Sequence, residues 1–293
     1  MDRPRFLELG RTASTYDPAG MVNIYGPVLR DEYIRVDWFT GVRNWGDRTS
    51  PIIVQHLSGR RPVLGRRVSN PHDSPVHMVV GSLLQVCRDE NTVVWGTGLI
   101  SANSAVPVRP RAIRAVRGPL TRERLLRQGI DCPPIYGDPV LLFPRIYRPE
   151  VTKRYKLGIV PHYFDASSPH LEQFQGSREV KVLDVGSGVG TFVDDLCSCR
   201  AIASSSLHGC IAADAYRIPS LWIELSSKVE GRGFKFRDYY ESIGESNVQP
   251  QPVRGEIDAD LLIAACSRRT MEIDLNELLE ACPFLPGDDA TLP

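Results

Sequence analysis

The apolar residues of this chain gather in short runs that end in glycine, proline or small polar residues. The run Thr92–Trp95 stops at Gly96-Thr97-Gly98, and the run Leu157–Val160 stops at Pro161-His162. Short apolar runs with little alternation are typical of strands that are buried on both faces, as in parallel sheets. We therefore expect buried strands at residues 77–80, 92–95, 112–116, 134–136, 157–160, 180–185, 201–203 and 218–223.

Stretches with helical spacing lie between several of these runs. They cover about residues 50–58, 119–128, 190–198 and 208–216, with two more at 258–267 and 273–281. Alternating strands and helices predict an α/β fold with open, mainly parallel sheets. Ligands of such sheets bind beyond the carboxyl ends of the strands, where this chain places glycine, arginine, aspartate, histidine and serine residues.

The length of 293 residues suggests two domains of about 150 residues each. Two prolines between residues 143 and 150 precede a charged stretch and suit a linker. We predict an N-terminal domain over residues 1–148 and a second domain over residues 149–262. A C-terminal helix and tail cover residues 263–293, and we expect a loose tail from Pro283 onward.

Charge and composition narrow the class of protein. Apolar residues make up 42% and charged residues 24% of the chain, which is ordinary for a soluble globular protein. A net charge of zero argues against a general nucleic-acid binder. The zero hides an asymmetry, because residues 1–150 carry 21 basic and 14 acidic residues (21 − 14 = +7), and the rest carry 14 and 21 (14 − 21 = −7). A solvated basic surface and a surface that faces an anionic ligand or membrane both explain this asymmetry.

Apolar runs and cysteines bear on the compartment. No run approaches the ~18 residues of a membrane span, and no signal peptide is evident. The seven cysteines are scattered and read as small core residues of a reduced protein. We therefore expect a cytoplasmic protein with at most peripheral contact at the inner face of the plasma membrane. Only Cys197 and Cys199 stand close, and a lone C-x-C pair is a poor zinc site, so we predict no metal.

A glycine-rich segment, Asp184–Gly190, follows one predicted strand and resembles the glycine loop of S-adenosylmethionine-dependent methyltransferases. That loop needs an acidic residue at the end of the next strand to hold the ribose hydroxyls. Here the next strand ends in Ser204-Ser205-Ser206. We favour an ordinary strand-to-helix turn, with cofactor binding as the alternative.

The segment Ser206-Leu207-His208-Gly209 opens a predicted helix directly after a strand. Free backbone N–H groups at a helix start favour an anion, and a histidine there can transfer a proton or contact a phosphate. We predict a functional role for His208, against the alternative of a structural ring.

Polar residues at other strand ends are candidate ligand contacts. Asp47, which could instead cap a helix, follows Gly46, whose missing side chain would let a ligand approach the backbone. Arg117 ends a strand, and arginine is the natural bidentate partner of a carboxylate or phosphate. Asp138 and His162 also follow strands, with a turn and a structural ring as their alternatives.

Taken in order, these motifs resemble those of the polysaccharide pyruvyl transferase family. The matching segments are Asn44-Trp45-Gly46-Asp47, Val80-Gly81-Ser82, Trp95-Gly96-Thr97-Gly98, Val116-Arg117-Gly118-Pro119-Leu120, Gly137-Asp138-Pro139, Val160-Pro161-His162 and Ser206–Pro219, with Lys228 beyond the last strand. The resemblance covers roughly residues 38–245.

This resemblance implies two Rossmann-like domains that face each other across a cleft, as in glycosyltransferases of the GT-B type, with the acceptor on the first domain and the donor on the second. It implies transfer of pyruvate from phosphoenolpyruvate to a sugar of a bacterial exopolysaccharide or cell-wall polymer precursor, forming a cyclic ketal and releasing phosphate without a cofactor. His208 and Asp47 are the expected catalytic residues. The expected substrate-binding residues are Asn44, Gly46, Gly81, Ser82, Gly96, Gly98, Arg117, Gly118, Asp138, His162, Ser206, Gly209 and Lys228.

The chain also departs from the family pattern. Many members carry arginine two residues before the motif histidine, where this chain has Ser206, so another base must bind the donor. Arg117, Lys228 and the helix start at His208 can supply positive charge to the carboxylate and phosphate of the donor. The basic first half would suit a lipid-linked saccharide acceptor at the membrane face. A nucleotide-sugar-dependent glycosyltransferase on the same fold and a non-catalytic carbohydrate-binding module are the competing functions.

Overall fold

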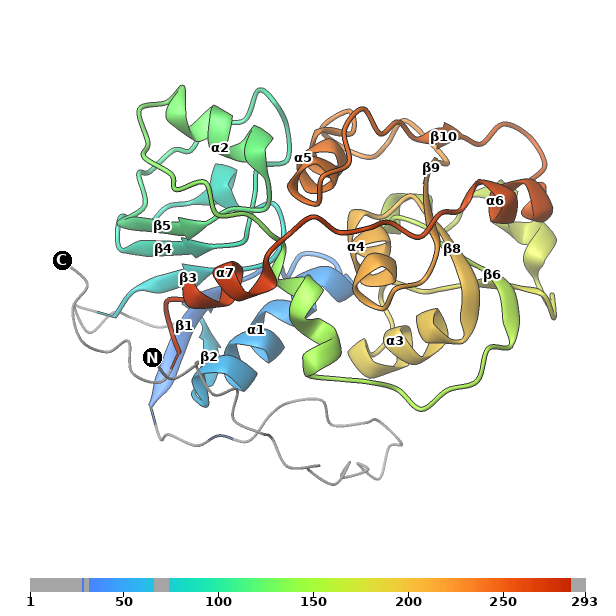
Figure 1. Cartoon of the computed structure of the whole chain (residues 1–293), viewed down its shortest axis with the longest axis horizontal. Helices are drawn as coiled ribbons and strands as arrows, with labels where there is room; N and C mark the ends of the chain where they lie inside the picture. Colours follow the sequence, from blue (N-terminus) through green and yellow to red (C-terminus); the bar gives the residue numbers. More distant parts are fainter. Residues whose placement is uncertain (1–27, 29–31, 66–73, 286–293) are drawn as a thin grey trace.

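The computed structural model describes residues 28, 32–65 and 74–285, which form two five-stranded parallel sheets (Figure 1). The N-terminal half contains β1 (Tyr33–Asp37), β2 (Arg61–Leu64), β3 (Val76–Met78), β4 (Thr92–Trp95) and β5 (Ala112–Ala115). The C-terminal half contains β6 (Tyr155–Val160), β7 (Val180–Val182), β8 (Cys199–Ser204), β9 (Ser220–Glu224) and β10 (Gln251–Pro252).

The two sheets have the same strand order. The first is ordered β2-β1-β3-β4-β5 and the second β10-β9-β8-β6-β7, so each reads 2-1-3-4-5 when counted from its own first strand. This is the order of doubly wound folds, and it confirms the predicted α/β class with two Rossmann-like halves. In each sheet the order reverses beside the first strand, between β1 and β3 and between β6 and β8. Ligands of such folds bind at these switch points, beyond the carboxyl ends of the strands.

Helices flank both sheets (Figure 1). Their bounds are α1 (Trp45–Ser58), α2 (Pro119–Leu126), α3 (Val189–Cys197), α4 (Leu207–Ala215), α5 (Phe234–Ser242), α6 (Ala259–Ala265) and α7 (Leu275–Glu280). Helix α4 lies close to its sheet because Gly209 has no side chain. A Cβ at Gly209 would stand 2.3 Å from the Ser204 hydroxyl and 2.8 Å from a Val160 methyl group.

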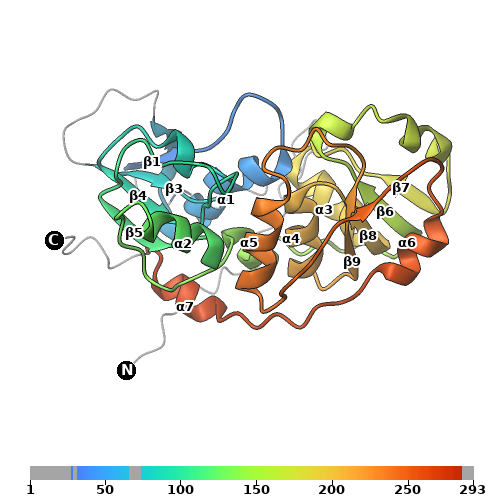
Figure 2. The ribbon, with the colours of Figure 1, turned by 90° about the horizontal axis from the view of Figure 1, so that it is seen from above.

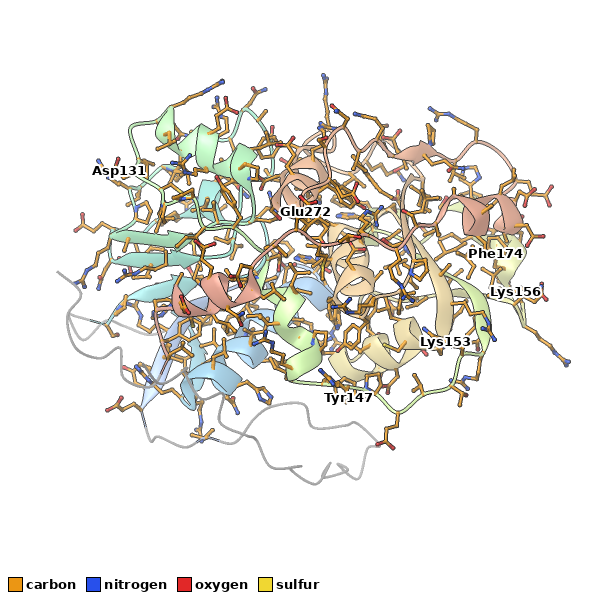
Figure 3. The ribbon with its side chains drawn as sticks, in the orientation of Figure 1. Asp131, Tyr147, Lys153, Lys156, Phe174 and Glu272 are labelled. Carbon is orange, nitrogen blue, oxygen red and sulfur yellow. The ribbon has the colours of Figure 1, made fainter. Side chains whose placement is uncertain are left out.

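One hydrophobic core joins the two halves. Trp45 begins α1 in the N-terminal half, yet its ring stacks on Phe192 of α3 with centroids 4.8 Å apart. Its backbone N–H donates to the Val185 carbonyl over 2.7 Å, and its indole N–H donates to the Val189 carbonyl over 3.1 Å. Tyr147 of the segment that links the halves, labelled in Figure 3, donates its hydroxyl to Asp194 of α3 over 2.6 Å. The first turn of α1 is therefore anchored in the second half.

Two segments of the C-terminal half return to the first half. In Figure 2, α5 lies between the two halves, and α7 lies along the lower edge of the N-terminal half in that view. Glu272, labelled in Figure 3, lies on the chain that runs to α7, and its N–H donates to the Ile243 carbonyl at the end of α5. At the end of this path, the Trp95 indole donates to the Leu278 carbonyl over 2.8 Å, and the ring of Phe284 packs on Trp95.

The structure corrects several predicted elements. Residues 134–136 form no strand, and only an isolated bridge joins Tyr136 to Val116. Pro133 and Pro134 lack the N–H groups that a ladder needs. Strand β7 stops at residue 182, three residues before the predicted end. Helix α1 begins at residue 45 rather than about 50.

The ends of the chain hold a further correction. The prediction of a loose tail from Pro283 onward is wrong for Phe284, which is 2% exposed. Residues 286–293 lie outside the described residues. All seven cysteines lie in the described residues, and none of them forms a disulfide. Within the described ranges, no helix has both the length and the apolar character of a membrane span. The domain limits at residues 148 and 262 stay a prediction.

Candidate active site

His208 occupies the first turn of α4, at the junction of the two halves. Its side chain is 9% exposed, and its ring lies against the backbone of Gly46 in α1. The Nε2 atom stands 3.6 Å from Oδ2 of Asp138, and neither atom has a hydrogen-bond partner among the described residues. A histidine of one half therefore faces a carboxylate of the other half, with bonding capacity unused on both.

Asp138 is fully buried and begins a 3-10 helix, Pro139–Arg145. Its Oδ1 atom accepts the Val140 N–H over 3.0 Å, which caps that helix and fixes the carboxylate plane. The other oxygen is left to face His208. The Oδ1 atom therefore serves the turn, as one interpretation of Asp138 predicts. The Oδ2 atom remains available to a ligand, as the other interpretation requires.

Asp47 lies in the first turn of α1 and is 6% exposed. Asn44 donates its side-chain N–H to Asp47 Oδ2 over 2.9 Å. Gly81, with φ of 106°, lies so close to Asp47 that a Cβ would stand 2.9 Å from the carboxylate. Burial raises the pKa of Asp47, and the neighbouring His208, Asn44 and Lys235 oppose that rise. A carboxylate held in this way is suited to accept a proton from a hydroxyl group near neutral pH.

His162 follows β6 and is 7% exposed. Burial, followed by the charges of Lys235 and His208, lowers its pKa from 6.5 to about 3. Its Nδ1 atom accepts the Phe164 backbone N–H over 3.3 Å, and the backbone N–H of His162 donates to the Ser205 hydroxyl over 2.9 Å. The ring is neutral at physiological pH, so it can orient a substrate but is a poor proton donor.

Arg117 differs from the accessible cation that the sequence suggests. It is fully buried, and its Nε and NH2 atoms both lie 2.9 Å from Oδ2 of Asp238 in α5. The remaining donors reach Ser82 Oγ at 3.0 Å and the Leu99 carbonyl at 2.6 Å. Its hydrogen-bonding capacity is thus used inside the protein. Thr121 donates its N–H and hydroxyl to the same Asp238, so this cluster fastens α5 to the N-terminal half.

Several glycines of the motifs lie directly against other groups of the protein rather than beside open space. The space beside Gly46, expected to admit a ligand, holds the His208 ring. Gly98 lies against the Arg117 guanidinium, and a Cβ at Gly118 would stand 1.8 Å from the Asp238 carbonyl oxygen. Gly96, with φ of 94°, lies against Pro139. Gly46 and Gly118 let the two halves approach closely, whereas Gly96 and Gly98 allow close packing within the N-terminal half. The roles of these residues toward substrate stay predictions.

The remaining predicted residues are less well connected. Ser206 is buried at the start of α4. Lys228 is exposed in the loop before α5, and the described contacts do not join its side chain to His208 or Asp47. Its contact with the substrate stays a prediction.

Lys235, in the first turn of α5, is a site residue that sequence reasoning missed. It is 9% exposed, and its charge lowers the pKa of both Asp47 and His162. Its own pKa is lowered to about 8, first by burial and then by Arg117, against Asp47 and Glu230. The signal available in the sequence is a lysine, one of only five, placed between Phe234 and Phe236.

The glycine-rich segment Asp184–Gly190 is used for packing between the halves. Besides the bonds from Trp45, its Ser187 carbonyl accepts a 2.8 Å hydrogen bond from Arg48 of α1. The loop thus contacts the N-terminal half through three of its backbone carbonyls. Among the described residues, no three histidine, cysteine or carboxylate side chains gather as a metal site.

Comparisons with known proteins agree with the arrangement of these motifs. Residues 75–227 match the family described as polysaccharide pyruvyl transferase. The chain is 30% identical over 223 residues to the uncharacterized protein L143 of Acanthamoeba polyphaga mimivirus, covering 72% of this chain and 75% of that protein. It is 26% identical over 170 residues to the succinoglycan biosynthesis protein ExoV of Rhizobium meliloti (strain 1021), covering 56% of this chain and 51% of ExoV.

Proposed function

Since the chain belongs to the polysaccharide pyruvyl transferase family, we propose that it transfers pyruvate from phosphoenolpyruvate to two hydroxyl groups of a saccharide, forming a cyclic ketal and releasing phosphate. The saccharide is part of an exopolysaccharide or a cell-wall polymer precursor. The similarity to a succinoglycan biosynthesis protein supports this substrate class.

The observation that carries the proposal is the buried pair of His208 and Asp138. Each presents an unsatisfied polar atom at the junction, 3.6 Å from the other. A carboxylate beside an imidazole orients the ring and stabilises its protonated form, as proton transfer requires. Asp47 lies close enough for the His208 charge to lower its pKa, so an acid and a base meet at one place.

The proposed reaction needs this combination. One hydroxyl oxygen bonds to the central carbon of the donor while the methylene carbon takes a proton and becomes a methyl group. The second hydroxyl oxygen bonds to the same carbon as the carbon–oxygen bond to phosphate breaks, and phosphate leaves with the electron pair. Of the two hydroxyl protons, one ends on the methyl group and the other with phosphate. In this scheme Asp47 accepts a hydroxyl proton, and His208 delivers a proton to the methylene carbon.

The donor is an anion, and the start of α4 can bind part of it. The N–H groups of a helix start point at an anionic ligand and carry a partial positive charge. His208 lies in this first turn, so an oxyanion bound there lies beside the proton-transfer group. The proposal invokes no cofactor, and it places the enzyme in the cytoplasm, where lipid-linked acceptors at the membrane face are within reach.

Phosphate release from phosphoenolpyruvate, measured with a panel of soluble and lipid-linked oligosaccharides, tests the proposed function. We expect acceptor-dependent phosphate release and a product whose mass equals that of the acceptor plus a ketal-linked pyruvate. Nucleotide sugars serve as competing donors in parallel reactions. Turnover of a nucleotide sugar, with none of phosphoenolpyruvate, would refute the proposal in favour of a glycosyltransferase.

A further inference from the structure

The donor that we propose carries a carboxylate and a phosphate, and the site must balance this charge. Four arginine or lysine side chains are at most 9% exposed among the described residues: Arg35, Arg117, Lys235 and Arg269, which pairs with Asp214 over 3.2 Å. Arg35 forms an ion pair with Asp89 over 3.5 Å, and Arg117 forms one with Asp238 over 2.9 Å. In the described part of the chain, no salt bridge or hydrogen bond involves the Lys235 ammonium, which lies 5.9 Å from the centre of the Phe236 ring. A largely buried ammonium without a salt bridge is costly, so its presence at a site points to an anionic ligand.

The position of α5 directs Lys235 toward the junction. Asp238 stands three residues further along, on the same side of the helix, and binds Arg117 and Thr121 of the N-terminal half. Phe236 stacks on Trp222 of β9 with centroids 4.3 Å apart and planes 5° apart. These contacts hold α5 from both sides and fix its rotation. Lys235 is thereby kept where its charge acts on Asp47 and His162.

The other candidate cations do not fill this role. The guanidinium of Arg117 is already engaged by Asp238, Ser82 and Leu99, and Lys228 is exposed. The ring of His162 is neutral because its pKa is about 3. Of these candidate cations, Lys235 is therefore the one that is buried at the junction and remains available to bind an anion.

We infer that the ammonium group of Lys235 binds an oxyanion of the donor, in the place of the arginine that Ser206 replaces in this chain. The inference rests on the proposed function. A lysine binds phosphate or carboxylate as a compact point charge, so it can follow the donor as the phosphate leaves. Helix α5 thus both fastens the halves together through Asp238 and carries a donor-binding group.

Replacement of Lys235 by methionine tests the inference, because methionine keeps an unbranched side chain and removes the charge. Hydrogen bonds to a charged group contribute about 1.5–3 kcal/mol, which corresponds to a roughly 10- to 100-fold rise in the donor KM. We expect inorganic phosphate and pyruvate, used as inhibitors, to show which oxyanion Lys235 holds, since only the matching one weakens by the same factor. Lys235→Arg should restore part of the affinity.

A matched control is Lys156→Met. Lys156 is exposed at the far end of the C-terminal half and pairs with Glu179 over 2.6 Å (Figure 3). Its replacement should leave the donor KM unchanged. If Lys235 is merely structural, Lys235→Met should lower Tm and leave the donor KM of the folded enzyme within a factor of two, which would overturn the inference.

The pH profile supplies a second readout. The charged and titratable groups that face Lys235 are Arg117, Asp47, Glu230 and His162. Lys235 loses its proton at about pH 8, so kcat/KM for the donor should fall above that pH, and Lys235→Arg should remove this fall. A wild-type profile that Lys235→Arg leaves unchanged would contradict the inference.

Calorimetry with inorganic phosphate and with phosphoenolpyruvate separates this inference from the proposed function. Binding to the wild-type protein that Lys235→Met abolishes supports the anion site even if no acceptor is turned over. Turnover of phosphoenolpyruvate with an unchanged donor KM in Lys235→Met leaves the proposed function standing and refutes the site. Absence of binding by the wild-type protein refutes the site as well.

Discussion

Replacement of Gly46 by alanine should separate catalysis from folding, because the new methyl group would meet the His208 ring. A Cβ at this position would stand 1.9 Å from Nδ1 and 2.1 Å from Cγ of His208. Ordinary contacts between non-bonded carbon atoms are about 3.5–4.0 Å. The ring must therefore retreat by more than about 1 Å, which changes its 3.6 Å approach to Asp138. Misplacement of a catalytic group by about 1 Å can cost a factor of about 100 in rate.

The accompanying loss of stability should be small. Overpacking typically costs about 1–3 kcal/mol, and alanine in a helix offsets up to about 1 kcal/mol of this relative to glycine. We expect kcat for phosphate release to fall about 100-fold while Tm falls by only a few degrees. Gly188→Ala is a matched control, since its Cβ would meet only the Thr191 side chain at 3.2 Å or more. A folded Gly46→Ala enzyme with kcat within twofold of the wild type would refute the assignment of His208 as the proton-transfer group.

Three further predictions concern single side chains. His208→Asn keeps a hydrogen-bond donor of similar size but carries no proton at neutral pH, so kcat should fall at least ~100-fold with Tm near that of the wild type; turnover within a few-fold would exclude this role. Arg117→Lys loses the bonds to Ser82 and Leu99 and should cost about 2–4 kcal/mol in urea unfolding with the donor KM unchanged; a raised donor KM at unchanged stability would instead make Arg117 a direct donor contact. The folded-state pKa of His162 is lowered to about 3, so its contribution to stability is present above pH 6.5 and is lost as the pH falls toward 3. The loss is at most about 1.4 kcal/mol per pH unit, and His162→Gln should flatten the acid limb of the unfolding free energy; an unchanged limb would show that the ring titrates normally.

The sequence predicts most of the sheet strands. Short buried strands such as β4 and β8 leave a clear apolar pattern, and polar motifs follow their carboxyl ends. Strand β1 is not predicted from the sequence, because Arg35 at its centre is a buried cation that interrupts the apolar run. Its burial depends on Asp89 and on the Ser74 carbonyl, which are distant in sequence.

The roles of individual residues are harder to predict, because they depend on partners from the other half. Arg117 reads as a ligand contact until Asp238, 121 residues away, is seen to occupy its guanidinium group. Gly118 is likewise expected to bind substrate, but the structure places the Asp238 carbonyl of α5 directly against it. Helix α5 has a modest apolar pattern, with Lys235 between two phenylalanines. No local pattern reveals that its neighbours lie across the junction.

The return of the chain to its N-terminal half has a consequence for the order of folding during synthesis. Trp95 belongs to the fourth strand to leave the ribosome, yet its indole partner, the Leu278 carbonyl, is made 183 residues later. Phe284, which packs on Trp95 and His77, follows later still. At typical elongation rates of about 5–20 residues per second, the segment that contains Leu278 and Phe284 is synthesised roughly 10–40 s after Trp95. Until then, this face of the first sheet lacks its packing partners. Vectorial folding can thus build the first sheet early, but its last core contacts form only after the second half has been synthesised.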